Sequence, residues 1–180
     1  MPRHFAHWPP DMPRSLRAPP ITLQQMLLNS SSKHPDKPAA IFAGKTLTYG
    51  ELQERVENLA GHLQHSCRVQ RGDRVLLDMQ NGHDFVVACF AILLADAVVV
   101  PVSPMNLAQE LRHYIEDSDA RVAIAEKDLA SRFSGLPIEH LLIPEEINTT
   151  AKPKPSVAQP DDLCMLPYTC LLYTSPSPRD

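Results

Sequence analysis

The sequence AILLADAVVVPV, residues 91–102, decides the fold of this chain. Its first half continues an apolar run that predicts a helix from His83 to Ala95, and its second half contains the β-branched run from Val98 to Val102. A strand that is apolar at successive positions is typically buried on both faces, as in parallel sheets. An apolar helix followed at once by such a strand is therefore typical of an α/β fold.

Strands and helical patterns alternate on both sides of this stretch. We predict strands near 74–79, 98–102, 121–125 and 140–143, separated by helices and short connections. Such alternation predicts a mostly parallel sheet with helices on both faces and right-handed crossovers. The α/β unit is expected to extend over residues 22–143.

Capping boxes predict the start of two helices. Thr22 with Gln25, and Thr48 with Glu51, have the spacing at which each side chain can bond the other residue's backbone amide. The apolar pattern of the first helix continues through Leu23, Met26, Leu27 and Ser30 until His34-Pro35, and the second helix carries Leu52, Val56, Leu59 and Leu63 on one face.

Shorter elements are predicted between and after these helices. Strands at 39–42 and 45–48, joined by Ala43-Gly44, are expected to form a hairpin. Asn106 and Gln109 are expected to cap a helix that ends at Asp117, and 127–133 is expected to be a short helix.

The composition excludes several classes of protein. With 17 basic and 21 acidic residues interspersed along the chain, the net charge is −4 and there is no basic block for nucleic acid. Four irregularly spaced cysteines fit a reducing cytoplasm better than a disulfide framework or a pair of metal knuckles. The most apolar stretch is interrupted by Asp96 and Pro101 and is too short to cross a bilayer, and residues 1–11 lack the apolar core of a secretory signal.

Proline content divides the chain into segments. Residues 1–21 form a Pro-rich arm that is expected to be extended, because proline removes an amide donor and disfavours helix before it. Residues 144–160 are also polar and Pro-rich, and are expected to form a surface connection. A further strand, 163–166, is then expected to lead into a loop at 167–169, where ligands of α/β sheets bind.

No complete site is visible in the residue pattern. None of the six glycines forms a Gly-x-Gly loop, so neither a dinucleotide fingerprint nor a whole phosphate loop is present. His62 and His65 have a spacing that could share a metal, but without a nearby third ligand a solvated helix face is favoured. Cys89 lies in an apolar run and is assigned to the core rather than to a nucleophile.

Two further polar groups have simple structural interpretations. The pair Asp161-Asp162 could attract a metal, although an exposed turn before a strand is the favoured interpretation. His113, Tyr114 and Asp117 are expected to lie on the outer face of an amphipathic helix.

Three motifs in order resemble the adenylate-forming (AMP-binding) enzyme superfamily. The segment LTYGEL, residues 47–52, looks like its first core motif, and residues 91–102 are similar to its second, with Asp96-Ala97 in place of the more usual glycine-alanine. The segment LPYT, residues 166–169, stands where members of the family begin their phosphate loop. The resemblance implies that residues 22–169 are a partial AMP-binding (adenylation) domain with the N-terminal subdomain of the adenylate-forming fold.

A narrower resemblance points to one branch of the family. The segment SPMN, residues 103–106, followed by Glu110-Leu111, and the opening HWPP, residues 7–10, resemble bacterial medium- and long-chain fatty acid ligases. This implies an ATP-dependent acid–thiol ligase that activates a fatty acid as acyl-adenylate and transfers it to CoA. An aryl-CoA ligase or a peptide-synthetase adenylation domain is the alternative within the family, and a noncatalytic α/β interaction module is the alternative outside it.

The same resemblance limits what this chain is expected to do. ATP, magnesium and CoA are the cofactors implied, but of the phosphate loop only Thr169 is present, and the catalytic and metal-binding residues would lie beyond it. We therefore expect none of these cofactors to bind the fragment and expect it to be inactive. Acyl chain length, oligomeric state and peripheral membrane association stay open, because the acyl pocket would be built mostly from later sequence.

The last eleven residues, Cys170 to Asp180, resemble a peptide translated from a transposase end and adapter of a sequencing library. They show no periodicity that continues the preceding sequence. We interpret them as a non-native tail and exclude them from reasoning about the fold.

Deleting Cys170 to Asp180 is expected to leave the free energy of unfolding unchanged, because an adapter-encoded peptide was never selected to fit this core. Denaturant unfolding of the shortened and the 180-residue chain checks this. A loss of more than about 1 kcal/mol, the size of a typical destabilising substitution, would show instead that the tail is native structure.

Overall fold

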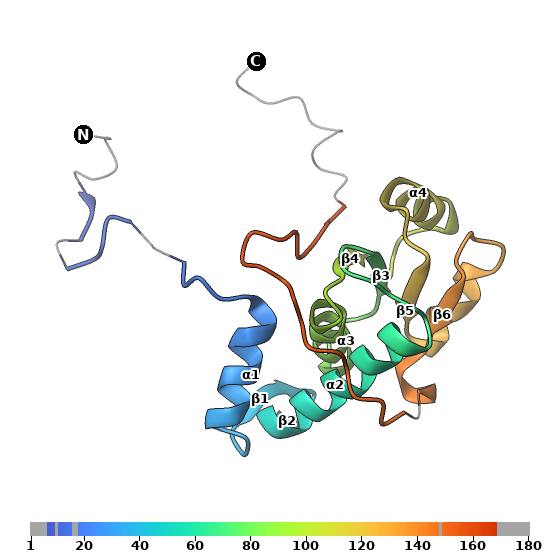
Figure 1. Cartoon of the computed structure of the whole chain (residues 1–180). Coiled ribbons are helices and arrows are strands. Elements are labelled where there is room, and N and C mark those ends of the chain that lie inside the picture. Colours follow the sequence, from blue (N-terminus) through green and yellow to red (C-terminus); the bar gives the residue numbers. More distant parts are fainter. Residues whose placement is uncertain (1–6, 10, 16–17, 148, 169–180) are drawn as a thin grey trace.

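The computed structural model describes residues 7–9, 11–15, 18–147 and 149–168. Strands and helices alternate along the chain from residue 23 to residue 146. The described part of the Pro-rich arm extends away from the remainder of the molecule (Figure 1), with its residues mostly exposed. The tail that begins at Cys170 lies outside the described residues.

The first helix, α1 (Leu23–Lys33), begins with the predicted capping box: Thr22 accepts from the Gln25 amide, and the Gln25 side chain accepts from Thr22. The predicted apolar pattern does not match the buried face. Leu23 and Met26 are nearly half exposed, while Gln24, Leu27 and Ser31 are buried. The buried face of α1 differs from the predicted one because α1 packs against other helices and its Gln24 side chain also contacts a later segment.

The predicted hairpin is present as β1 (Pro38–Phe42) and β2 (Lys45–Thr48), paired antiparallel. Ala43 and Gly44 have φ values of 48° and 76°, the left-handed conformations that a two-residue hairpin turn requires. Thr48 then forms the second capping box with Glu51 and starts α2 (Tyr49–His65). All four leucine and valine positions predicted for one face of α2 are buried.

The main sheet has four strands: β3 (Arg74–Asp78), β4 (Val98–Val102), β5 (Val122–Ala125) and β6 (His140–Leu142). Their spatial order is β4-β3-β5-β6 and every pair is parallel. The predicted strands and their parallel arrangement are confirmed, with ends that differ by one residue at most.

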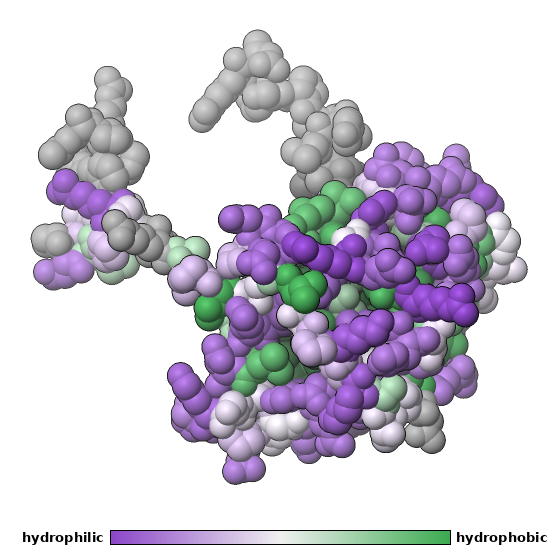
Figure 2. Space-filling view, viewed as in Figure 1, coloured by the Kyte–Doolittle hydropathy of each residue, from purple (hydrophilic) through white to green (hydrophobic). Residues whose placement is uncertain are grey.

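Helices cover both faces of this sheet (Figure 1), as predicted. One face contacts α2 and α3 (His83–Leu94) through a core that includes Val75, Leu77 and Val99. The other face contacts α4 (Ala108–Ser118) and the 3-10 helix η2 (Lys127–Phe133) through a second core. The visible surface is mostly hydrophilic, with apolar residues in small separate areas (Figure 2), because most apolar side chains are buried in these two cores.

The short helix predicted at 127–133 is present and has the tighter 3-10 form. The predicted start of the preceding helix needs correction. The helix α4 begins after Leu107, and the Asn106 side chain instead accepts a hydrogen bond from the Ser103 amide, 2.8 Å away. Asn106 therefore closes the turn before the helix, a competing role that is common for asparagine.

Residues 149–168, which we call the strap, run along the outside of α2 and α3 (Figure 1). Lys152 Nζ donates to Glu57 Oε2 at 2.7 Å, and the Lys154 amide donates to Gln64 Oε1 at 2.7 Å. At Gly61 the strap backbone touches α2 so closely that an added Cβ would lie 1.8 Å from the Ala151 carbonyl oxygen. The Pro-rich connection is thus at the surface, as predicted, but is held against the helices.

The substitution Gly61→Ala is expected to lower the free energy of unfolding by up to about 2 kcal/mol, because overpacking usually costs about 1–3 kcal/mol and alanine returns about 1 kcal/mol in a helix. Backbone atoms form the contact, so the strap must shift, and this outweighs the gain of about 1 kcal/mol that alanine brings to a helix. Denaturant unfolding provides the measurement.

The matched control is Gly50→Ala in the same helix, where an added Cβ would lie 3.3 Å from its nearest neighbour, the Pro35 carbonyl oxygen. If Gly61→Ala increased the free energy of unfolding by the amount that helix propensity alone predicts, the close contact of the strap backbone with α2 would be contradicted.

Candidate functional site

The end of the strap pairs with the free edge of β4. The Val99 amide donates to the Cys164 carbonyl at 3.0 Å, and the Leu166 amide donates to the Val99 carbonyl at 2.8 Å. Met165 thereby forms an isolated parallel bridge with Val99. The segment 163–168 runs in the same direction as β4 and so heads toward the carboxyl edge of the sheet, where α/β proteins bind ligands.

The strand predicted at 163–166 is therefore reduced to one bridge. In β4, the backbone N–H and C=O groups of every second residue point toward the free edge. After Val99, the next residue on that side is Pro101. Proline has no amide hydrogen to donate. The ladder cannot continue in full past Val99 for this reason.

Tyr168, the last described residue, is fixed by α4. Its ring lies 4.5 Å from the Tyr114 ring and 6.3 Å from the His113 ring, measured between centroids. Its hydroxyl donates to Asp117 Oδ2. Burial, followed by this hydrogen bond to Asp117, raises the pKa of Tyr168 to about 12, so the hydroxyl stays protonated as a donor.

This contact corrects the prediction that His113, Tyr114 and Asp117 simply form an outer helix face. His113 and Asp117 are exposed, but Tyr114 is half-buried against the second core, and all three contact Tyr168. Residues so far apart in the chain gave no sequence pattern that could connect them. The aromatic contact nevertheless places the segment that precedes Thr169.

An arginine side chain fixes the loop after β4 through hydrogen bonds to its backbone. Arg132, in η2, donates to the Pro104 carbonyl at 2.6 Å and to the Asn106 carbonyl. Asn106 Nδ2 lies 3.4 Å from the Tyr114 hydroxyl, which links this loop to the aromatic cluster around Tyr168. The loop at the carboxyl end of β4 therefore has few free backbone acceptors.

Asp78 is a buried carboxylate at the carboxyl end of β3, between β4 and β5. Its side chain is fully buried and Arg132 Nη1 lies 3.2 Å from its Oδ2, although neither oxygen has a well-oriented hydrogen-bond donor among the described residues. Burial raises the pKa of Asp78 to about 6, while Arg132 opposes the shift and Glu126 adds to it. Sequence reasoning missed this pair; the signal was a carboxylate directly after the apolar run 75–77 of the strand.

The remaining predicted site residues lie in several separate places. Thr169 is outside the described residues. Asp161 and Asp162 lie in a turn, as predicted; Asp161 is exposed, and Asp162 is half-buried and accepts from Arg71 at 2.7 Å. His65 is exposed with its Nε2 3.1 Å from the Lys152 carbonyl, and His62 is half-buried, with its pKa lowered by burial and by His140.

The core assignment of Cys89 is confirmed, since it packs against the first core and burial raises its pKa to about 11. Within the described part of the chain, no three His, Cys, Asp or Glu side chains gather where they could hold a metal. None of the described helices is long and apolar enough to cross a membrane.

Comparison with known families decides the assignment, since the model of the AMP-binding enzyme family matches residues 27–170. The chain belongs to the AMP-binding enzyme family. Among curated relatives of this AMP-binding chain, the long-chain-fatty-acid–CoA ligase of Haemophilus influenzae is 39% identical over 99 residues, covering 55% of this chain and 18% of the relative. The ligase of the same name from Bacillus subtilis is 35% identical over 121 residues, covering 67% of this chain and 21% of the relative.

A peptide synthetase is also among the relatives. Phosphinothricin tripeptide synthetase PhsC of Streptomyces viridochromogenes is 33% identical over 130 residues, or 72% of this chain and 12% of the relative. The AMP-binding chain thus spans about a fifth of the length of the fatty acid ligases it matches.

Solved structures show the same fold. A long-chain-fatty-acid-CoA ligase from Archaeoglobus fulgidus superposes with a TM-score of 0.77 at 24% identity, over 87% of this chain and 36% of that one. The N-terminal subdomain of Klebsiella oxytoca NpsA, in complex with 3-hydroxyanthranilyl-AMSN, gives 0.73 at 24% identity, over 82% and 37%. The predicted N-terminal subdomain of the adenylate-forming fold is confirmed.

The substitution Asp78→Asn is expected to flatten the dependence of stability on pH. A pKa raised from 3.8 to about 6 means that the folded state keeps a proton that the unfolded state has lost. The stability contribution of this carboxyl is therefore full below about pH 4 and is lost as the pH rises through about 6. A shift of this size corresponds to at most about 3 kcal/mol.

Urea unfolding at about pH 4 and about pH 7 measures the effect. At the lower pH the two proteins carry a neutral side chain at this position and should be similarly stable, and at the higher pH the wild-type chain should lose stability relative to Asp78→Asn. Asp119→Asn, at an exposed site, is the matched control. An equal wild-type–variant difference at both pH values would contradict the raised pKa.

Proposed function

We propose that this chain is the amino-terminal part of an AMP-forming fatty acid–CoA ligase. The observation that carries the proposal is the pairing of Cys164 and Leu166 with Val99, which directs the segment before Thr169 along β4 toward the carboxyl edge of the sheet. The described part of the segment that resembles the start of the family's phosphate loop, residues 166–168, lies at this edge. The ligase relatives support the choice of fatty acid and CoA as substrates.

The proposed reaction has two steps. A carboxylate oxygen of the fatty acid attacks the α-phosphorus of ATP and pyrophosphate leaves; the CoA thiol then attacks the acyl carbon and AMP leaves. Charge redistributes over phosphate oxygens in the first step, so backbone amides and hydroxyls fixed in advance are effective there. The contribution of this chain is to fix the loop entrance through Tyr168 and to offer the Thr169 hydroxyl to a phosphate.

Magnesium normally accompanies ATP in this chemistry. The described residues lack a cluster of three side chains suited to a metal, so we assign no magnesium ligand to them. Cysteine usage fits a cytoplasmic location, which we propose with the same function.

A peptide-synthetase adenylation domain is the second candidate. The observation that favours it is the 33% identity to the tripeptide synthetase over 130 residues. The two functions share acyl-adenylate formation and differ in the acid used and in the acceptor of the acyl group. A comparison of acids therefore separates them.

The 180-residue chain is expected to give no fatty acid-dependent pyrophosphate release, whereas the complete gene product is expected to release pyrophosphate with fatty acids. A single neutral hydrogen bond from Thr169 contributes only about 0.5–1.5 kcal/mol net, far too little to bind a triphosphate. Groups that stabilise a transition state together lose nearly all effect when most are missing.

Pyrophosphate release is measured with fatty acids of several lengths, and with amino acids and aryl acids as controls. Turnover by the 180-residue chain would contradict the need for the missing groups. Activity of the complete protein only with amino acids or only with aryl acids would replace the fatty acid assignment by the corresponding alternative.

A further inference from the structure

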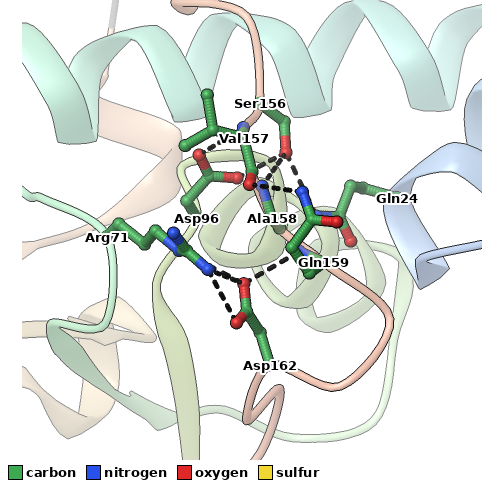
Figure 3. Close-up of polar contacts among 8 residues, drawn as sticks. All are labelled: Gln24, Arg71, Asp96, Ser156, Val157, Ala158, Gln159 and Asp162. Atoms are coloured by element: carbon green, nitrogen blue, oxygen red, sulfur yellow. Dashed lines mark hydrogen bonds and ion pairs between the residues drawn. The ribbon is translucent and has the colours of Figure 1, made fainter.

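Asp96 has an unusual backbone and a side chain with two partners on the strap. It follows α3 with φ of 60°, a left-handed conformation in which asparagine, aspartate and above all glycine are tolerated. Its Oδ2 accepts from the Val157 amide at 2.8 Å and its Oδ1 accepts from the Ser156 hydroxyl. Figure 3 shows the carboxylate pointing at both groups.

The backbone of Asp96 is fixed from another side. Its carbonyl accepts from the Gly72 amide at 2.8 Å, and its amide donates to the Leu93 carbonyl at 3.0 Å. The carboxylate therefore projects from a turn that is tied to both α3 and the 71–73 turn. A group held in advance in this way orders its partners at a low cost in entropy.

Two further contacts extend the attachment. Ser156 Oγ also accepts from Gln24 Nε2 at 3.3 Å, which explains why this glutamine on α1 is buried. Five residues beyond Val157, Asp162 accepts from Arg71 with both oxygens at 2.7 Å (Figure 3). We call the contacts of Asp96 with Ser156 and Val157 the clasp.

The clasp restricts the position of the next residues of the strap. Between Val157 and the bridge at Met165 lie seven residues, of which Pro160 cannot donate a backbone hydrogen bond. The bridge itself consists of two backbone hydrogen bonds with Val99, on an exposed segment. So short a pairing is weak alone, and its register depends on where the strap arrives.

We propose that Asp96 is a positioning residue that sets the register of residues 163–168 on β4 and thereby the entrance of the phosphate loop. The part that concerns the loop rests on the proposed function. A glycine at this position, the more usual residue in the motif that residues 91–102 resemble, adopts the same backbone but has no carboxylate. The clasp is thus a feature that the aspartate adds to the fold of this chain.

The first experiment measures amide hydrogen exchange in the 180-residue chain for Asp96→Gly and Asp96→Asn. Glycine keeps the left-handed backbone and removes the clasp, and asparagine keeps one acceptor oxygen. The reporter is the Leu166 amide, which bonds to Val99 rather than to Asp96. Asp96→Gly is expected to speed its exchange about tenfold, equivalent to about 1.4 kcal/mol, with partial rescue in Asp96→Asn.

Two variants serve as matched tests. Asp119→Gly makes the same change at another left-handed aspartate, with φ of 57°, which pairs with Arg74 rather than with Ser156 or Val157, and should leave Leu166 exchange unchanged. Ser156→Ala removes one partner of the clasp at an exposed position and should show part of the effect without affecting folding. Unchanged Leu166 exchange in both Asp96→Gly and Ser156→Ala would overturn the proposal.

The second experiment uses the complete gene product and separates kcat from the KM for ATP. Asp96→Gly is expected to raise the KM for ATP about tenfold, with smaller changes in kcat and in the KM for fatty acid. Asp96→Asn is expected to bring the KM for ATP most of the way back to the wild-type value. Faster Leu166 exchange with unchanged kinetics would overturn the link to the loop. If the wild-type protein releases no pyrophosphate with any acid, the proposed function fails, while Leu166 exchange still decides whether the clasp sets the register.

Discussion

The parallel pairing of β3 with β4 and β5 is the constraint on which the other contacts depend. Leu76 and Leu77 point to opposite faces of β3 and both are fully buried, so each face must be covered by helices. Fully burying a leucine contributes about 1.5–3 kcal/mol, and the central strand does so on both sides. The helices α2, α3 and α4 are in turn placed where they can receive the strap and Tyr168.

Local patterns were sufficient for the elements of this unit. The capping boxes at Thr22 and Thr48 form as predicted, and the β-branched run at 98–102 is a buried parallel strand. These features are decided by residues close together in sequence or by their own burial. Where a prediction failed, as for the buried face of α1 and the strand at 163–166, the cause was a partner distant in the chain or a proline in the neighbouring strand.

The candidate site was less predictable for the same physical reason. The motif LPYT indicates what residues 166–169 resemble, but not that Tyr168 would contact Tyr114 and Asp117. The strand prediction for 74–79 gave Asp78 no role, and only the fold shows it buried beside Arg132. Contacts between side chains separated by fifty residues result from the topology, which a single sequence determines but does not display.

Asp96 shows how one departure from a family pattern can change a fold locally without breaking it. The turn after α3 requires a left-handed residue, and aspartate meets this requirement at a cost that glycine would not have. The two hydrogen bonds to Ser156 and Val157 are charge-assisted and offset part of this cost. The side chain that glycine lacks is thus the one that ties the strap to the turn. The strap continues directly into the pairing with β4. The left-handed turn at the end of α3 is therefore coupled to the position of residues 163–168 at the edge of the sheet.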